Sequence, residues 1–202
     1  MLAGHRARAV SEWRGGQWVP KPIEEARYRM AVDIEARLKL IEEHVQAEID
    51  MDMDRIMATW GKSPWFDDVG WEETWSGRKG IQEHYEELLG AFPDMDIKEQ
   101  ARHVTDDAVI LEVVVTGTHL GQWRELPPLG RKMRSRVCAL YTFDEEGLLE
   151  LERTYYDKGI ILEQLGMFQD PRRPLGRVMA VLTPPFSVIR GFVRQLLRRA
   201  KS

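Results

Sequence analysis

Cysteine is almost absent from this chain of 202 residues, because Cys138 is the only one. A single cysteine excludes a disulfide within the chain and favours a reducing compartment. Cys138 lies in the apolar run 137–141, so we expect it to be buried and to serve packing rather than nucleophilic chemistry.

Long apolar runs are also absent, and no stretch approaches the ~20 uncharged apolar residues that span a bilayer. Residues 1–8 lack the apolar stretch of a secretory signal. We therefore expect a cytoplasmic protein. Hydrophobic residues make up 43% of the chain and charged residues 31%, which is the balance of an ordinary folded domain.

Signals for metals and nucleotides are missing as well. The five histidines, His5, His44, His84, His103 and His119, show no metal-ligand spacing such as H-x-x-x-H. The chain has no Gly-x-Gly-x-x-Gly run, no Walker loop and no Gly-x-Ser-x-Gly. We expect neither a metal nor a cofactor, which leaves proton transfer by side chains as the available chemistry.

Acidic residues are absent from residues 171–202, which carry eight basic residues. The net charge of −4 therefore divides into +8 for this tail and −12 for residues 1–170. Apolar residues recur at helical spacing from 186 onward, with arginines around them. Such a helix over 186–202 favours an anionic membrane surface, here the inner face, or an acidic partner. Docking on the chain's own acidic body or on a second subunit is the alternative, and nucleic acid is the least favoured partner.

Helical patterns dominate the first part of the chain. Residues from Ile23 to about Ile49 contain no Gly or Pro and repeat apolar residues at helical spacing, which predicts a long amphipathic helix. Shorter helices are predicted over 52–60 and 81–92. Residues 1–22 contain Gly15-Gly16 and two prolines, and we interpret them as a loose extension.

Strand patterns dominate the second part, where β-branched and aromatic residues gather. Strands are predicted at 63–69, 95–105, 109–116, 133–143 and 148–156. A short helix then reaches Leu165. Helices followed by a meandering sheet predict an α+β domain rather than a doubly wound one.

Several short motifs accompany these elements. Gly-Thr-His-Leu-Gly-Gln-Trp at 117–123 is followed by Pro-Pro-Leu-Gly-Arg at 127–131, and Phe-Pro-Asp stands upstream at 92–94. Tyr-Tyr-Asp at 155–157 precedes Ile-Leu-Glu-Gln-Leu-Gly at 161–166. In this combination and order, the motifs resemble the SnoaL-like polyketide cyclases of the nuclear transport factor two-like superfamily.

The resemblance covers about residues 33–170. It implies a cone-shaped, curved mixed sheet, with N-terminal helices that close an apolar pocket, as in a cystatin-like α+β barrel. Residues 1–32 would then be an N-terminal extension and residues 171–202 a basic tail, which a minimal cyclase lacks.

Families of this kind include cofactor-independent cyclases, ketosteroid isomerases, dehydratases and epoxide hydrolases, and also members without catalysis. We favour an acid/base enzyme that acts on a hydrophobic, carbonyl-bearing small molecule by aldol-type cyclisation, isomerisation or dehydration, and we expect a homodimer. One alternative is a non-catalytic carrier of a lipophilic ligand that the tail brings to a membrane. Another is an interaction domain whose open sheet face forms a dimer.

Asp157 is the main catalytic candidate. Alternation along the last strand places Leu149, Arg153 and Tyr155 on one face and the polar Glu152 on the other. The polar row is expected to face water, so Asp157 would point inward, where loss of solvent raises a carboxyl pKa. The resemblance also implies a general acid/base role at this position. The alternative is that Asp157 caps the helix that follows.

His119 is the second catalytic candidate, because it belongs to the Gly-Thr-His motif. It could polarise a substrate carbonyl or share a proton with Asp157, or it could instead hold the Trp123 turn through a hydrogen bond to a loop carbonyl. We also expect Arg153 to pair with Glu112. Candidates for contact with substrate, each with packing as its alternative, are Tyr155, Arg153, His84, Tyr85, Trp65, Trp60 and Trp123.

Overall fold

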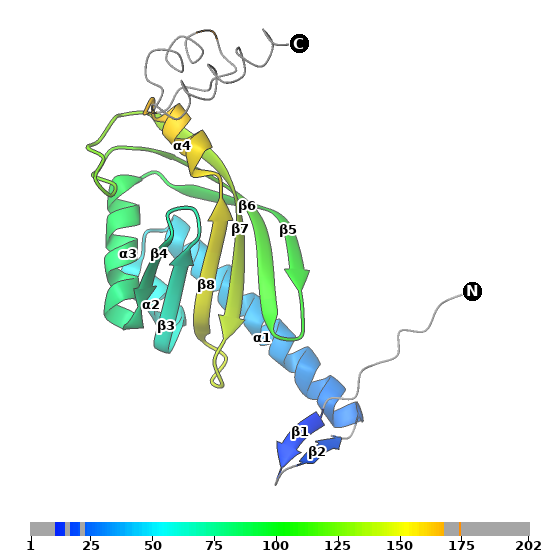
Figure 1. Ribbon diagram of the computed structural model, residues 1–202. Coiled ribbons are helices and arrows are strands. Elements are labelled where there is room, and N and C mark those ends of the chain that lie inside the picture. Colours follow the sequence, from blue (N-terminus) through cyan, green and yellow to red (C-terminus); the bar gives the residue numbers. More distant parts are fainter. Residues whose placement is uncertain (1–10, 15–16, 21–22, 168–173, 175–202) are drawn as a thin grey trace, which may run out of the picture.

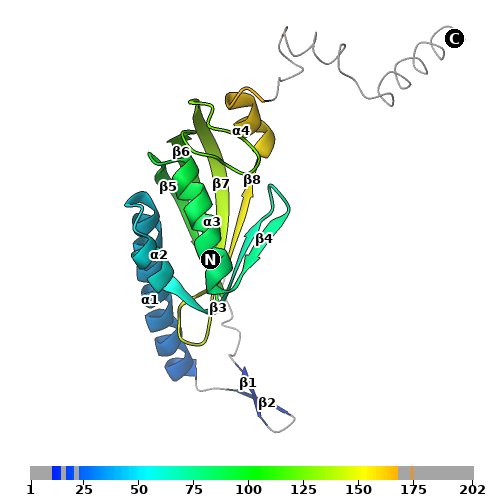
Figure 2. The same ribbon diagram turned by 90° about the vertical axis from the view of Figure 1, so that its left-hand side faces the viewer.

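The computed structural model describes residues 11–14, 17–20, 23–167 and 174 (Figure 1). It shows helices in the first part of the chain and a six-stranded sheet that curves without closing, which is the α+β fold predicted above. Helices α1, α2 and α3 lie on one side of this sheet (Figure 2).

The first three predicted helices, over 23–49, 52–60 and 81–92, are confirmed. Helix α1 spans Ile23–Ile49, and α2 spans Met53–Thr59 with Asp52 as its N-cap. Helix α3 spans Gly77–Ala91 and so begins four residues before the predicted start. Its first turn is anchored because the Arg78 guanidinium donates hydrogen bonds to the carbonyls of Met57 and Trp60. Helix α4 spans Lys158–Gln164.

The large sheet has the strand order β4-β3-β8-β7-β6-β5, in which only β3 and β8 run parallel. Its strands are β3 (Trp60–Asp68), β4 (Glu73–Ser76), β5 (Asp96–Val104), β6 (Ala108–Thr118), β7 (Lys132–Phe143) and β8 (Leu149–Tyr156). All but β4 were predicted. This strand has four residues and lies at the sheet edge, where it pairs only with β3.

The N-terminal extension contains a hairpin that the sequence analysis did not predict. Strands β1 (Ser11–Arg14) and β2 (Gln17–Pro20) pair antiparallel. The residues between them are Gly15-Gly16, a dipeptide that two-residue hairpin connections favour. The predicted helix over 186–202 lies outside the described residues. Among the residues that are described, no helix has the length and apolar character needed to cross a membrane.

The side chains of β8 face the opposite sides of the sheet from those predicted, and this difference determines which residues reach the interior. Leu149 is buried as expected, but the pairing of β7 with β8 shifts register between Thr142 and Phe143. Beyond this irregularity the polar residues Glu152 and Thr154 are buried, at 4% and 8% exposure, whereas Tyr155 is 45% exposed. A register irregularity exchanges the two faces of a strand, so the polar row faces the interior.

The Gly-Thr-His-Leu-Gly motif joins the end of β6 to the end of α3. The amides of Leu120 and Gly121 both donate to the carbonyl of Ala91, at 2.9 and 3.1 Å. A Cβ atom on Gly121 would lie 2.1 Å from the carbonyl oxygen of Gly90. Glycine is therefore required here by close backbone approach, and the loop that follows is fixed on α3.

Replacing Gly121 with Ala should lower the free energy of unfolding by roughly 1–3 kcal/mol, because the new methyl group collides with backbone. Gly90→Ala provides the matched control. Its Cβ meets nothing within 4 Å, and alanine in a helix should raise the stability by about 1 kcal/mol. Urea unfolding followed by circular dichroism measures both, and equal effects of the two changes would contradict the assigned contact.

Candidate active site

A cavity lies between the inner face of the sheet and helices α1 and α3. Its volume of about 120 Å³ is roughly ten times what one water molecule requires. Most of its lining is apolar or aromatic and includes Val45, Phe66, Leu88, Phe92, Met133 and Tyr141. Four carboxylates interrupt this surface, and the side chains of Glu48 and Glu152 are almost completely buried. The cavity therefore combines an apolar wall with acidic groups withdrawn from water.

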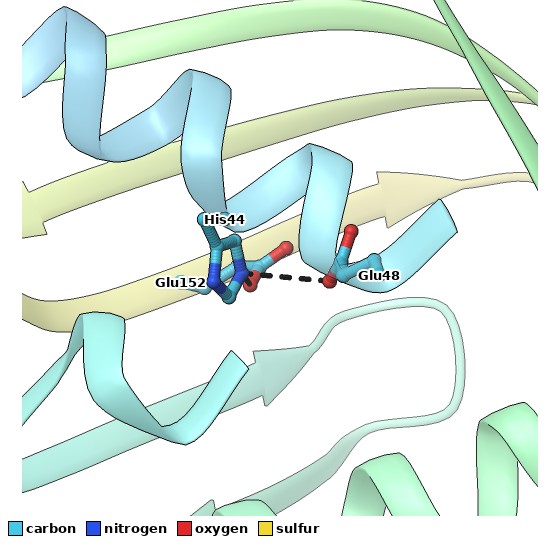
Figure 3. A group of neighbouring side chains, drawn as sticks. All are labelled: His44, Glu48 and Glu152. Carbon is cyan, nitrogen blue, oxygen red and sulfur yellow. Dashed lines mark hydrogen bonds and ion pairs between the residues drawn. The ribbon is translucent and has the colours of Figure 1, made fainter. Parts of the chain in front are cut away.

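Glu152 is held at the wall of this cavity by two neighbouring donors. Its Oε2 accepts a hydrogen bond from the Tyr85 hydroxyl at 3.1 Å and lies 3.3 Å from Nε2 of His44. The Tyr85 oxygen is in turn 3.0 Å from the same ring nitrogen. Figure 3 shows how α1 presents His44 to Glu152 of β8. The carboxylate is therefore fixed in orientation at the cavity wall.

The proton on Nδ1 of His44 can be placed from its neighbours. Thr59 donates its hydroxyl hydrogen to the carbonyl of Ile56 at 2.7 Å, so its Oγ1 is free to accept from Nδ1 of His44, also at 2.7 Å. With Nδ1 protonated, Nε2 faces Glu48 Oε1 at 3.4 Å and Glu152 Oε2 at 3.3 Å. Two nearby carboxylate oxygens favour a second proton on this ring, which makes His44 an imidazolium.

The electrostatics of the cluster agree with this assignment. Burial alone would lower the pKa of His44, but the charge of Glu48 and the hydrogen bond to Glu152 outweigh it and raise that pKa to about 10. Burial raises the pKa of Glu152, while the hydrogen bond and charge of His44 oppose the rise. The pKa of Glu152 is thus raised toward neutral pH, which suits a side chain that accepts and returns a proton at that pH.

A second polar group occupies another part of the same cavity. The Arg124 guanidinium lies 2.9 Å from Oδ2 of Asp68, which also accepts the Tyr156 hydroxyl at 2.7 Å, and it pairs with Glu73. Three indole rings surround this guanidinium at 5.0 to 5.8 Å, those of Trp71, Trp75 and Trp123. Arg124 is thus held by charge and by cation–π contacts.

His84 lines the cavity but belongs to neither charged cluster. Its ring lies 3.9 Å from the ring of Phe66 and 4.5 Å from that of Trp75, centroid to centroid. Burial, assisted by the charge of Arg124, lowers the pKa of His84 to about 3. The ring is neutral at physiological pH, and its Nε2 has no hydrogen-bond partner among the described residues.

The comparisons with known proteins agree with this architecture. The family model of the SnoaL-like polyketide cyclases matches residues 52–165, which is more than half of the chain. The chain belongs to the SnoaL-like polyketide cyclase family. No curated protein matches the sequence.

Solved structures place this SnoaL-like chain among fold relatives. AclR from Streptomyces galilaeus has 22% identity and a TM-score of 0.58, with 66% of this chain and 87% of AclR covered. IdmH from Streptomyces antibioticus has 21% identity and a TM-score of 0.55, with 64% and 98% covered. A protein from Xanthomonas campestris has 15% identity and a TM-score of 0.60, with 66% and 98% covered. At these identities the likeness shows the fold alone.

Asp157 does not occupy the predicted position. It is exposed, and its Oδ1 accepts hydrogen bonds from the amides of Gly159 and Ile160 at 2.8 and 3.3 Å. It is the N-cap of α4, which was the alternative reading of this residue. The inward placement is wrong because the irregularity of β8 reversed the alternation on which it rested.

His119 is buried, with 0% exposure, but it does not line the cavity. Neither ring nitrogen has a hydrogen-bond partner among the described residues, and its ring packs 5.4 Å from that of Phe92. Burial lowers its pKa. Its backbone, and not its ring, secures the loop, through hydrogen bonds with the backbones of Gly130 and Arg131. The predicted sharing of a proton with Asp157 therefore has no support in this geometry.

The other candidates divide between the two faces of the sheet. Tyr155 and Trp65 are 45% and 48% exposed, and Arg153 pairs with Asp67 at 2.6 Å rather than with Glu112. These three do not line the cavity, because they follow the outward row of their strands. Cys138 is likewise only half-buried.

The remaining three aromatic candidates and His84 lie inside the fold. Trp60 is a buried core residue, and Tyr85 orients Glu152. His84 and Trp123 line the cavity, and their contact with a substrate stays a prediction.

The sequence analysis did not identify His44, Glu48 and Glu152 as site residues. A usable signal existed, because His44 and Glu48 are four residues apart on a predicted helix and therefore share a face. Their donor atoms and those of Glu152 all lie within 4.8 Å of one another, a grouping that could surround a metal ion. In this geometry the Nε2 proton of His44 occupies that space, so a cation could bind these atoms only in exchange for the proton.

The buried histidines His44 and His84 should give opposite pH dependences of stability. His44 has a folded pKa near 10 against an ordinary 6.5, so its contribution is complete below 6.5 and is lost as the pH rises toward 10. His84 has a folded pKa near 3, so its contribution is complete above 6.5 and is lost as the pH falls toward 3.

Urea unfolding across this pH range should show that His44→Gln removes the alkaline decline. His84→Asn should reduce the acid decline, to which the buried His119 also contributes because its pKa is lowered as well. The exposed His103 is the control, and His103→Gln should change neither limb. An unchanged alkaline decline in His44→Gln would contradict the assigned imidazolium.

Asp157→Ala should lower the unfolding free energy by about 1 kcal/mol, because two amides at the start of α4 lose their acceptor. Asp52→Ala, which removes the N-cap of α2, should cost a similar amount and serves as the comparison. Because Asp157 lies outside the cavity, its replacement should leave ligand binding unchanged. A loss of ligand binding without loss of stability would restore the catalytic interpretation of Asp157.

Proposed function

We propose that this SnoaL-like chain is a cofactor-independent acid/base enzyme that acts on a hydrophobic, carbonyl-bearing small molecule. The observation that carries the proposal is the Glu152 carboxyl, which is buried, lines an apolar cavity and has a raised pKa. Family membership supports an enzyme of this kind. One fold relative, SalBIII, is an epoxide hydrolase/cyclase-like enzyme of pyran ring formation, with 16% identity and a TM-score of 0.55.

Glu152 would act as the base in the first step. Its carboxylate removes a proton from the carbon next to the substrate carbonyl, and the electron pair of the C–H bond passes into an enolate. The protonated Glu152 then returns the proton. Return to a different carbon gives isomerisation, and return to a departing hydroxyl gives dehydration. If the enolate carbon attacks a second carbonyl of the substrate, return to the new alkoxide completes an aldol cyclisation.

His44 and Tyr85 would be positioning residues for this base. Both contact Oε2 of Glu152, so they fix one oxygen of a carboxylate that lines the cavity. The imidazolium also limits how far the pKa of Glu152 can rise, because it stabilises the ionised form. Without that charge, burial would keep the carboxyl protonated and unable to accept a proton.

The buried polar groups also favour an enzyme over a carrier. A carrier of lipophilic ligands needs only the apolar walls of the cavity. Burying two carboxylates and an imidazolium is energetically costly, and replacing such groups with apolar residues often stabilises a protein. Two carboxylates in the cavity wall with an imidazolium behind them are therefore understandable if these groups take part in chemistry.

Exchange of α-protons for deuterium tests the proposal without knowledge of the natural substrate. β-Tetralone, a hydrophobic bicyclic ketone, would be incubated with the protein in D₂O with a metal chelator, and loss of the α-proton signal would be followed by NMR. Glu152→Gln should reduce the catalysed exchange at least ~100-fold, because a positioned base typically contributes 10²–10⁴-fold. The amide keeps the shape of the side chain but cannot accept the proton.

Glu112→Gln is the matched control, since Glu112 also pairs with a histidine, His103, at 3.0 Å, but on the protein surface. Exchange should be unchanged in this variant. If the wild-type protein binds β-tetralone and yet exchanges it no faster than buffer does, the enzyme proposal fails for simple ketones. Equal rates for the wild type and Glu152→Gln would remove Glu152 as the base.

A further inference from the structure

The charges around the cavity do not balance. In the part of the chain that the structure describes, four carboxylates line it, those of Glu48, Asp68, Glu87 and Glu152, and Arg124 is the one cation in this lining. The His44 imidazolium behind the wall reduces the total to −2. A concave site with low-dielectric walls strengthens such a potential. The cavity should therefore repel anions and attract cations.

The imbalance can be traced to one residue. Asp68 has Arg124 as its cation at 2.9 Å, and Glu152 has His44 together with the Tyr85 hydroxyl. Glu87 is half-buried and accepts a hydrogen bond from the backbone amide of Arg124. Glu48 has the same His44 nitrogen as Glu152, at the longer distance of 3.4 Å, and shares the Tyr85 hydroxyl with Glu152 as a neutral neighbour.

Among the described residues, Glu48 is thus a buried carboxylate that has no cation of its own. Its side chain is 8% exposed, and the residue lines the cavity. A buried charge that is only partly compensated costs several kcal/mol, so a positive group placed beside it in the cavity would be strongly stabilised. A cationic ligand supplies what the folded protein lacks at this position.

The rest of the lining fits the same kind of ligand. Phe66, Phe92 and Tyr141 present aromatic rings at the cavity, and such rings attract a desolvated cation. His84 also lines the cavity, with a neutral ring whose Nε2 has no partner among the described residues. The lining offers less to an anion, because both terminal nitrogens of Arg124 already hold carboxylates, those of Asp68 and Glu73. Only its Nε lacks a hydrogen-bond partner among the described residues.

We propose that the ligand of this cavity carries a protonated amine, which pairs with Glu48 while the apolar part of the molecule fills the aromatic walls. The inference rests on the proposed function and narrows its substrate class to hydrophobic carbonyl compounds that also bear an ammonium group. Glu48 then binds substrate, and Glu152 remains the base.

Three ligands that share one bicyclic skeleton test the proposal by calorimetry at neutral pH. They are β-aminotetralin, which is an ammonium ion, the neutral β-tetralone, and tetralin-β-carboxylate. The amine should bind about tenfold to a hundredfold more tightly than the ketone, the range expected for a hydrogen bond to a buried charged group. The carboxylate should bind most weakly.

Three variants locate the effect. Glu48→Gln should abolish the preference for the amine and leave the affinity for the ketone within about twofold, whereas Glu48→Asp should retain the preference because it keeps the charge. Glu42→Gln is the control on the same helix, since Glu42 is exposed and pairs with Arg102 outside the cavity. Binding of the amine no tighter than that of the ketone in the wild type overturns the inference, and so does a preference that persists in Glu48→Gln.

The outcome is separable from that of the proposed function. Catalysed proton exchange on β-tetralone together with no preference for the amine would remove only the ammonium site. A preference for the amine that depends on Glu48, in a protein that exchanges no protons, would leave the ammonium site standing and remove the enzyme.

Discussion

The His44 imidazolium between Glu48 and Glu152 is the interaction on which the site depends. Without this cation, α1 and β8 would bring two carboxylates together in a nearly dry interior, and at least one would have to be protonated. With it, the two elements are joined by charge behind the cavity wall, and Glu152 can remain ionised. Thr59 contributes from α2, because its hydroxyl accepts the other ring proton and so fixes which face of the imidazole meets the acids.

The helices and most strands could be predicted from the sequence because local patterns determine them. The run Ile23–Ile49 has helical spacing and no Gly or Pro, and the structure has a helix with those bounds. The β-branched run of β6 is similarly explicit. The four-residue strand β4 was missed because so short a segment carries no alternation that a reader can use; its pairing with β3 forms it.

The site could not be predicted in the same way, because it reverses the rule that served for the fold. The alternation rule assumes that polar residues face water, and for β8 it predicted that Glu152 points outward and Tyr155 inward. The structure does the opposite, since the register shift exchanges the faces and partners from α1 and α3 satisfy the buried carboxylate. Such partners come from residues about 70 and 110 positions away in the chain, and no local pattern contains them. Asp157 was misassigned for the same reason. The alternation rule placed it in the inward row, and this was given more weight than its ability to cap the helix that follows.

The family signature and the candidate chemistry occupy different parts of this chain. The Gly-Thr-His-Leu-Gly run fixes a loop on α3, and the Arg124 that follows lines the cavity. The signature therefore determines the shape of the cavity. His44 and Glu48 lie before residue 52, where the family match begins, and only Glu152 lies within it. The charge that sets the state of Glu152 therefore comes from a segment that the match does not cover. A chain with the same signature but another residue at the position of His44 would keep the cavity and lose the ionised base. Membership in this family therefore predicts the fold better than it predicts the reaction.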